Sequence, residues 1–416
     1  GRLSRQGLHC QNPGGWKVSS DIQRLLRALE KLEQIELQNV TIEMDRLELD
    51  LPLSAAPDIV RGLAKGAKAL QQARFEFKPE EFKGRIEEVI IGATRGDGGT
   101  RGSVVKLGGE TAPPFYPKEG ARPNPPVVTI DVFDMAQPQY ALEQRKVYSP
   151  VWDDPCKWAK FCEEELKAEM ITVHLVNTDP MLLKVEGGKD LYRTPEEGAE
   201  VVKDVLKATH LPIAVGGSGN PTNDPLVLQK AAEAAAGERV MLASATLSQN
   251  WKRVSQAAID YHHDVLSWTD LDVNMQKSLN QKLLDLGVPK DHIIIDPTSG
   301  ALGYGIDYSF SVTERIRLAG LKGDASLQMP ISLGVTNAWG ARESWKKKDE
   351  WGDRKYRGPI WEAVQALTLT LAGADLCMML HPWAVKLYKD ALSAMSGGEP
   401  GKNVDQRSWV AGVQPM

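Results

Sequence analysis

Short apolar runs alternate with longer amphipathic stretches between residues 127 and 397. The short runs are rich in Val, Ile and Leu, which is typical of parallel strands buried on both faces. The longer stretches repeat their apolar positions with the 3.6-residue period of a helix. The predicted strands cover residues 127–135, 170–178, 211–217, 239–246, 264–269, 292–297, 330–337 and 374–381. The predicted helices that follow them start near Asp154, Thr194, Asp224, Gln249, Asp272, Ser309, Lys355 and Pro382.

Capping residues mark the starts of several of these helices. Thr194 precedes Pro195 and two carboxylates, an order that favours a helix N-terminus. Asp154 and Asp224 each precede a proline, so we expect both aspartates to cap their helices. The regular alternation of strands and helices predicts an α/β fold, the (β/α)8 TIM barrel, which takes about 250 residues. A doubly wound open sheet is the alternative, but the Gly-x-Gly-x-x-Gly turn usual after its first strand is missing.

The first 126 residues follow a different pattern and are predicted to form an N-terminal extension to the barrel, which spans 127–397. Residues 18–37 and 54–73 have helical periodicity, and these helices either contact other subunits or face solvent. Residues 398–416 are expected to form a polar tail.

A hairpin is predicted at the end of this extension. Residues 85–93 and 102–107 alternate like two strands around the turn-forming residues 95–99. We expect the hairpin to plug the bottom of the barrel. The proline-rich residues 111–126 then lead into the first barrel strand.

Composition narrows the class of protein. The chain has 416 residues with 42% hydrophobic content, enough for one large core and a smaller one. A net charge of −5 gives no basic excess, so we expect no nucleic-acid partner and no membrane partner. No apolar run reaches the roughly 20 residues of a transmembrane helix, and no signal peptide is visible. We therefore expect a cytoplasmic protein.

The cysteines and motifs give little catalytic chemistry. Cys10, Cys156, Cys162 and Cys377 form no Cys-x-x-Cys pair, whereas iron–sulfur ligands usually come from closely spaced cysteines. We therefore predict no iron–sulfur cluster, no structural zinc and no other metal site in this chain. The His-Glu-x-x-His and Gly-x-Ser-x-Gly motifs are missing too, so no catalytic residue is predicted.

The loops after the strands carry ligands in this fold, and here they are rich in Asn, Asp, Thr and Gly. They contain few Lys or Arg residues, so they offer hydrogen bonds and close backbone approach rather than charge for a phosphate. This composition favours a polar, heterocyclic or amide-bearing ligand. Taken singly, each such residue is more often a turn or capping residue. The candidate binding residues are Asn220, Asn250, Asn274, Asp296, Thr298, Gly300, Gly303, Tyr304, Asn337 and His381.

Titratable residues near the predicted loop face leave their roles open. Asp296 ends the sixth strand, where it either accepts a hydrogen bond from a ligand or caps the sixth loop. His381 ends the eighth strand alone, which favours a structural or hydrogen-bonding histidine over a base. His262 and His263 stand at a helix end on the opposite face, where a capping role is expected.

The sixth loop and its helix have a specific sequence, Asp-Pro-Thr-Ser-Gly-Ala-Leu-Gly-Tyr-Gly-Ile-Asp-Tyr-Ser-Phe-Ser over residues 296–311. This segment resembles the small subunit of corrinoid iron–sulfur proteins, the delta subunit of the archaeal-type acetyl-CoA decarbonylase/synthase complex. The similarity covers about residues 87–392, and Glu43-Met44-Asp45 is closer to the delta branch. Other matching segments are residues 92–94, 98–101, 232–238, 270–274, 314–317 and 361–364.

The resemblance implies a barrel subunit that pairs with a large, gamma-type subunit carrying cobalamin and an Fe4S4 cluster. It also implies transient contact with a methyltetrahydropterin methyltransferase and with the nickel-containing acetyl-CoA synthase of the reductive acetyl-CoA (Wood–Ljungdahl) pathway. The small subunit would position the corrinoid above its loop face, at the interface, while the partner holds most of it. Corrin side chains are amides, which bond well to Asn, Thr, Ser and backbone groups.

A second resemblance supports the alternative function. The predicted barrel is similar to pterin-binding methyltransferases and dihydropteroate synthases, which hold pterin with Asp and Asn at strand ends. Asn250, Asp296 and Asn337 match that pattern in residue type. The alternative is therefore an autonomous methyltetrahydropterin:corrinoid methyltransferase, although the fold-level part of this comparison is an analogy.

Overall fold

The structure is a computed structural model that describes residues 78–116, 120–135 and 146–396. These residues belong to one compact unit, which begins at Lys78. The predicted helices over 18–37 and 54–73 and the predicted tail lie outside the described residues. The domain boundaries placed at residues 126 and 397 stay predictions.

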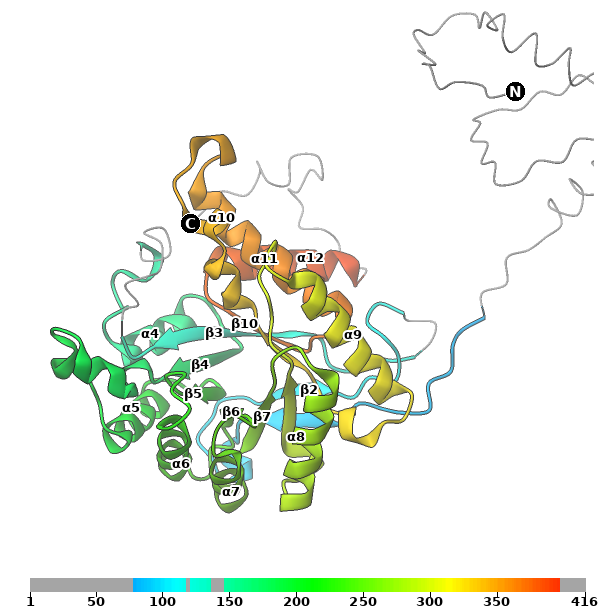
Figure 1. Cartoon of the computed structure of the whole chain (residues 1–416), viewed down its shortest axis with the longest axis horizontal. Helices are drawn as coiled ribbons and strands as arrows, with labels where there is room; N and C mark the ends of the chain where they lie inside the picture. The colour runs from blue at the N-terminus through cyan, green and yellow to red at the C-terminus, as the bar shows by residue number, and fades with distance from the viewer. Residues whose placement is uncertain (1–77, 117–119, 136–145, 397–416) are drawn as a thin grey trace, which may run out of the picture. The chain divides into compact units, whose positions relative to one another are not determined.

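Parallel strands form an eight-stranded barrel in the order β8-β7-β6-β5-β4-β3-β10-β9 (Figure 1). A parallel bridge between Ile295 and Ile331 joins β8 to the residues before β9, so the sheet closes on itself. The predicted TIM barrel is confirmed, and this closure excludes the open sheet. The strands are β3 (Val127–Phe133), β4 (Met170–His174), β5 (Ile213–Gly216), β6 (Met241–Ala245), β7 (Asp264–Trp268), β8 (Ile293–Asp296), β9 (Ser332–Gly334) and β10 (Leu376–Met379).

Amphipathic helices follow the strands and cover the barrel (Figure 1). They are α4 (Pro155–Glu164), α5 (Pro195–Ala208), α6 (Asp224–Ala234), α7 (Trp251–Tyr261), α8 (Val273–Leu286), α9 (Ile306–Leu321), the short α10 (Arg342–Trp345), α11 (Arg354–Ala372) and α12 (Pro382–Met395). Thr194 and Asp154 cap their helices as predicted, because their side chains accept hydrogen bonds from first-turn N–H groups. No helix in the described part of the chain is long and apolar enough to span a membrane.

Two details differ from the sequence prediction. Helix α9 begins at Ile306, three residues before Ser309. Asp224 does not cap α6, because its carboxylate accepts hydrogen bonds from the N–H and Oγ of Ser218 and the N–H of Gly219, at 2.8–3.0 Å. Donors in the preceding loop therefore bind the carboxylate that we expected at the helix.

The barrel strands also end earlier than predicted, at the ends that face the ligand loops. Residues after His174 turn into the 3-10 helix η2 (Val176–Thr178), and residues after Gly334 into η7 (Val335–Gly340). Asn and Thr favour such turns once the strand ladder can no longer be extended. The loop face is therefore built largely from tight turns that fix side chains close to the barrel.

A β-hairpin lies against the opposite, N-terminal end of the barrel. Its strands β1 (Glu88–Ile91) and β2 (Val105–Gly108) pair antiparallel around η1 (Arg95–Asp97). Inward-facing residues of both hairpin and barrel form one apolar cluster, consisting of Val89, Ile91, Val105, Leu107, Val127, Met170, Ala214, Met241, Leu266, Ile294, Leu376 and Met378. Water is therefore excluded from this end of the barrel.

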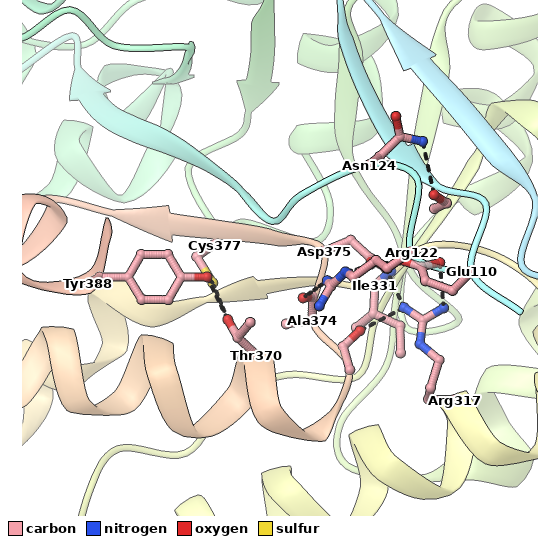
Figure 2. Close-up of polar contacts among 12 residues, drawn as sticks. Glu110, Arg122, Asn124, Arg317, Ile331, Thr370, Ala374, Asp375, Cys377 and Tyr388 are labelled. Atoms are coloured by element: carbon pink, nitrogen blue, oxygen red, sulfur yellow. Dashed lines mark hydrogen bonds and ion pairs between the residues drawn. The ribbon is translucent and has the colours of Figure 1, made fainter. Parts of the chain in front are cut away.

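Buried charges join the hairpin connection to the same end (Figure 2). The Arg317 guanidinium donates to Asp375 and, at 2.6 Å, to the Gly373 carbonyl, and lies 3.5 Å from Glu110. Arg122 forms a second ion pair with Asp375 at 3.1 Å. Asp375 also accepts a hydrogen bond from the Ile331 N–H at 2.8 Å, just before β9. These contacts connect Glu110 and Arg122, which precede the barrel, to its last strands.

Candidate functional site

Alternate strand residues face the barrel interior, so the strand pattern determines which side chains reach its C-terminal mouth. Val127 and Met170 belong to the apolar cluster at the bottom. Two residues further on, the hydroxyls of Thr129 and Thr172 are 2.8 Å apart. The next inward positions are Asp131 and His174, at the mouth. The interior therefore changes from apolar to polar along the barrel axis.

Asp296 ends β8 on the inner face and is buried, with 5% of its surface exposed. Its carboxylate accepts one hydrogen bond among the described residues, from the Thr298 N–H at 2.8 Å. Burial raises the pKa of Asp296 to about 7, although this hydrogen bond opposes the shift. A carboxyl that is partly protonated near neutrality can donate or accept a hydrogen bond toward a ligand.

Thr298 holds the start of the sixth loop in an unusual conformation. Its φ angle is 70°, in the left-handed region that threonine rarely adopts. The Thr298 hydroxyl donates to the Thr269 carbonyl at 2.7 Å, while its N–H binds Asp296. Such a conformation costs about 1–3 kcal/mol and persists where neighbouring contacts enforce it, commonly at functional sites.

The sixth and seventh loops hold each other in place. The Ser299 hydroxyl donates to the Gly334 carbonyl at 2.5 Å, and Asn337 Nδ2 donates to the Ser299 carbonyl at 3.0 Å. The Gly300 N–H donates to Ser309 Oγ at 2.7 Å, at the start of α9. A Cβ atom on Gly300 would lie 2.7 Å from the Tyr304 carbonyl oxygen, so the loop can fold back only with glycine here.

The tip of the sixth loop is open to solvent. Gly303 has a φ angle of 78°, and Tyr304 exposes 53% of its surface. Tyr308, one turn into α9, exposes 66%. Large exposed aromatic side chains beside a polar mouth are typical of interaction sites.

The remaining candidate asparagines differ in how far their side chains are used in hydrogen bonds within their own loops. Asn220 is committed, because Oδ1 accepts from the Thr222 and Asn223 N–H groups and Nδ2 donates to Asp179. Asn250 is exposed and caps α7 through the Arg253 N–H at 3.3 Å. Asn274 is exposed at the start of α8. Of these side chains, that of Asn274 is the most available to a partner.

His381 is a buried helix cap rather than an open ligand group. Its Nδ1 accepts a hydrogen bond from the Trp383 N–H at 3.2 Å, and its ring lies against Trp339 with centroids 5.9 Å apart. Burial lowers the pKa of His381 to about 4, so the ring is neutral at physiological pH. Nearby, the buried Glu362 accepts hydrogen bonds from Trp339 Nε1 and the Leu380 and His381 N–H groups.

The structure brings three further residues together at the mouth that were not predicted. His174 Nε2 lies 3.0 Å from Asp131 Oδ1, and Thr336 Oγ1 donates to the second Asp131 oxygen. The sequence does carry a signal for two of them. In Val127–Phe133 and Met170–His174, the polar residues occupy alternate positions in otherwise apolar strands. Polar side chains at inward positions near the end of a barrel strand indicate a site.

Among the described residues, no cluster of three or more His, Cys, Asp or Glu side chains is arranged to hold a metal ion. The mouth therefore offers hydrogen bonds, one carboxyl with a raised pKa and exposed aromatic surface. The fold and the site together define a TIM barrel whose C-terminal mouth is polar and suited to binding a ligand.

Comparison with known proteins identifies the family. Residues 88–348 match the family model described as the CO dehydrogenase/acetyl-CoA synthase delta subunit. The chain is 49% identical over 349 residues to the acetyl-CoA decarbonylase/synthase complex subunit delta of Archaeoglobus fulgidus, covering 82% of this chain and 75% of that relative. Identity to the Methanocaldococcus jannaschii delta subunit is 41% over 402 residues, or 94% and 96% of the two chains. The chain therefore belongs to the family of acetyl-CoA decarbonylase/synthase delta subunits.

Solved structures resemble this chain more distantly. A Xanthomonas albilineans dihydropteroate synthase with 4-aminobenzoic acid aligns with a TM-score of 0.44 at 16% identity, covering 67% of this chain and 95% of that chain. A Thermus thermophilus dihydropteroate synthase aligns with a TM-score of 0.42 at 13% identity, covering 67% and 96%.

Proposed function

We propose that this delta subunit pairs with a large, gamma-type subunit that carries cobalamin and an Fe4S4 cluster. Together they would support methyl transfer from a methyltetrahydropterin to acetyl-CoA synthase. Family membership implies a multisubunit complex. The observation that carries the finer proposal is the loop face, which combines exposed Tyr304 and Asn337 with the buried side chains of Asp131 and Asp296.

The described cysteines support the expectation that an iron–sulfur cluster lies on the partner. Cys162 is buried on α4, where burial raises its thiol pKa well above the usual range. Cys377 lies in the barrel wall, with Sγ 3.7 Å from the Tyr388 hydroxyl, and burial raises its pKa to about 11 (Figure 2). Cluster ligands are thiolates, so these buried thiols do not suit the role. Cys10 lies outside the described residues.

The residues at the mouth fit an amide-fringed corrinoid. Asn274 is exposed and can donate to or accept from an amide, the Oδ1 atom of exposed Asn337 can accept from one, and Tyr304 adds a ring face and a hydroxyl. When bound, the corrinoid supplies the cobalt chemistry of methyl transfer. This chain would position the ring, exclude water from one face and satisfy its amides. That division of roles requires no nucleophile from the barrel.

The proposal is tested by producing the chain alone and together with its large subunit, then measuring cobalt, iron and visible absorbance. We expect the chain alone to be colourless, and a 1:1 complex to contain both metals. A large subunit that carries both metals but does not bind this chain would contradict the proposal.

Asp296 favours a second candidate, the autonomous methyltetrahydropterin:corrinoid methyltransferase. A buried carboxyl whose pKa is about 7 suits a group that holds the ring nitrogens of a pterin. This function predicts that the isolated chain binds methyltetrahydropterin stoichiometrically and methylates added Co(I) cobalamin. Neither result is expected of a positioning subunit, so the two measurements separate the candidates.

A further inference from the structure

His174 and Asp131 form a fixed pair on neighbouring strands at the barrel mouth. The strand register places Phe133 beside His174 and Asp131 beside Thr172, so these side chains share the inner face. Asp131 is 2% exposed and uses both carboxylate oxygens, one toward His174 and one toward Thr336. The hydrogen bond from Thr336 therefore fixes the orientation of the carboxylate that contacts the imidazole.

This anchoring determines which nitrogen of His174 carries the proton. Thr336 donates to one oxygen of Asp131, and a carboxylate accepts hydrogen bonds at both oxygens, so the 3.0 Å contact with Asp131 Oδ1 favours a proton on His174 Nε2. In the neutral ring, Nδ1 is then left with a free lone pair. The same logic orients histidines in catalytic triads and in metal sites.

The ring of His174 is held on two further sides. Phe133 stacks on it with centroids 4.9 Å apart and an interplanar angle of 18°. On β5, a Cβ atom at Gly216 would lie 2.8 Å from His174 Nδ1, so glycine is needed for the ring to fit. The ring therefore cannot turn away from the mouth without breaking contacts on β3.

The free nitrogen of His174 is available to a ligand. The side chain is 24% exposed, against 3% for Asp131, and Nδ1 has no hydrogen-bond partner among the described residues. The chain from Thr336 through Asp131 to His174 thus ends in an acceptor at the mouth. Such an acceptor is complementary to a neutral N–H donor.

We propose that His174 Nδ1 binds an amide-type N–H of the ligand, with Asp131 as the positioning residue that fixes the acceptor tautomer. Two sources offer this chemistry, the primary amides of a corrinoid and the amide-type N–H of a pterin ring. The corrinoid assignment rests on the proposed function, whereas the acceptor role of His174 does not.

The tautomer is measured first, by 15N NMR of the full chain labelled at histidine, with His174→Phe assigning the resonance. We expect Nε2 to be protonated and Nδ1 bare at neutral pH. The opposite tautomer would overturn the proposal. Asp131→Asn should reverse the tautomer, because its amide can donate to Nε2 and leave the proton on Nδ1.

Ligand contact is then measured in two arms. One compares the 1:1 complex with its large subunit before and after corrinoid loading, and the other titrates the chain with methyltetrahydropterin. In the arm with the true ligand, the Nδ1 resonance of His174 should move upfield. His174→Phe and Asp131→Asn should each weaken that ligand about tenfold, the loss expected for one hydrogen bond. His174→Gln, which keeps an acceptor, should recover most of the affinity.

The outcomes test the acceptor role of His174 and the proposed function separately. A shift in the corrinoid arm supports the acceptor role and the proposed function. A shift with pterin alone supports the acceptor role and favours the methyltransferase candidate. An unchanged resonance in both arms overturns the acceptor role, even if a cobalt-containing complex forms and the proposed function stands. Thermal unfolding of each variant shows that lost affinity does not come from lost folding.

Discussion

The two ends of the barrel use buried polar groups in opposite ways. At the N-terminal end, Arg317 and Arg122 both contact Asp375, and a hairpin excludes water. At the C-terminal mouth, Asp296 has one hydrogen bond among the described residues, and the Nδ1 atom of His174 has none there. Buried polar groups are therefore paired with one another at the first end, whereas at the second end some have hydrogen-bonding capacity left for a ligand.

This difference separates stability from binding along one axis. Paired buried charges are costly to break, because each lost partner leaves an uncompensated charge in a low dielectric. Buried groups with few partners cost stability in the free protein but are ready to meet a ligand. We therefore expect substitutions at the bottom to change stability without changing binding, and substitutions at the mouth to weaken binding without lowering stability.

The largest expected effect is that of Arg317→Met. The variant keeps the side-chain volume but removes the donor to Asp375 and to the Gly373 carbonyl. We expect it to lower the free energy of unfolding by about 3–5 kcal/mol, measured by chemical denaturation. Arg315→Met, an exposed position on the same helix, is the matched control and should have little effect. Equal losses in both variants would contradict the comparison.

Glu110→Gln should change the pH dependence of stability. Burial, assisted by the charge of Asp375, raises the pKa of Glu110 to about 8 from an ordinary value of 4.5. An acid whose pKa is higher when folded binds a proton on folding. Wild-type stability should therefore fall as pH rises between these values, by at most about 1.4 kcal/mol per pH unit.

The glutamine variant removes this contribution. It should match the wild type near pH 4 and become more stable than the wild type near pH 8. Denaturation midpoints across this range provide the measurement, with the half-exposed Glu87→Gln as control. A variant whose stability relative to the wild type is the same at both pH values would show that Glu110 is ionised in the folded protein.

Asp296→Asn tests the mouth in the same way, over a narrower pH window. Burial raises the pKa of Asp296 from 3.8 to about 7, so the wild type should lose stability as pH rises through this range. The variant should be the more stable protein at pH 8, yet bind its ligand less well. Exposed Asp270→Asn is the control for both measurements. If Asp296→Asn is more stable but binds the ligand as well as the wild type, Asp296 only holds the sixth loop and does not contact the ligand.

The sequence predicts the framework well because strand and helix periodicity are local properties. All eight barrel strands are found, and Asp154 and Thr194 cap helices as their positions indicate. The error at Asp224 has a non-local cause, because its carboxylate is taken by donors six and five residues earlier in the loop. Capping rules consider only the helix that follows.

The mouth was harder to predict because its residues meet only after the barrel closes. Asp131 and His174 are 43 positions apart, and Thr336 is 205 positions from Asp131. The loop composition drew attention to asparagines, but Asn220 and Asn250 bind their own loops. Their residue types suit a ligand and a turn equally well, so only the contacts distinguish the two roles. Alternation within β3 and β4 would have indicated the missed pair.

Tyr304→Ala should have the smallest effect on stability and a clear effect on association. The side chain is 53% exposed at the loop tip, so its removal should change the free energy of unfolding by less than about 0.5 kcal/mol. If the large subunit and its corrinoid cover this face, an aromatic side chain here should contribute about 1–2 kcal/mol to the complex, or about 5- to 30-fold in Kd. Tyr116→Ala is the matched control, because Tyr116 is 55% exposed in the connection that leads to the start of β3. The large subunit is titrated with each variant. Its affinity should be lower for Tyr304→Ala and unchanged for Tyr116→Ala. If the two variants bind equally well, the partner covers another surface, and the polar mouth must be explained by a ligand of the barrel itself.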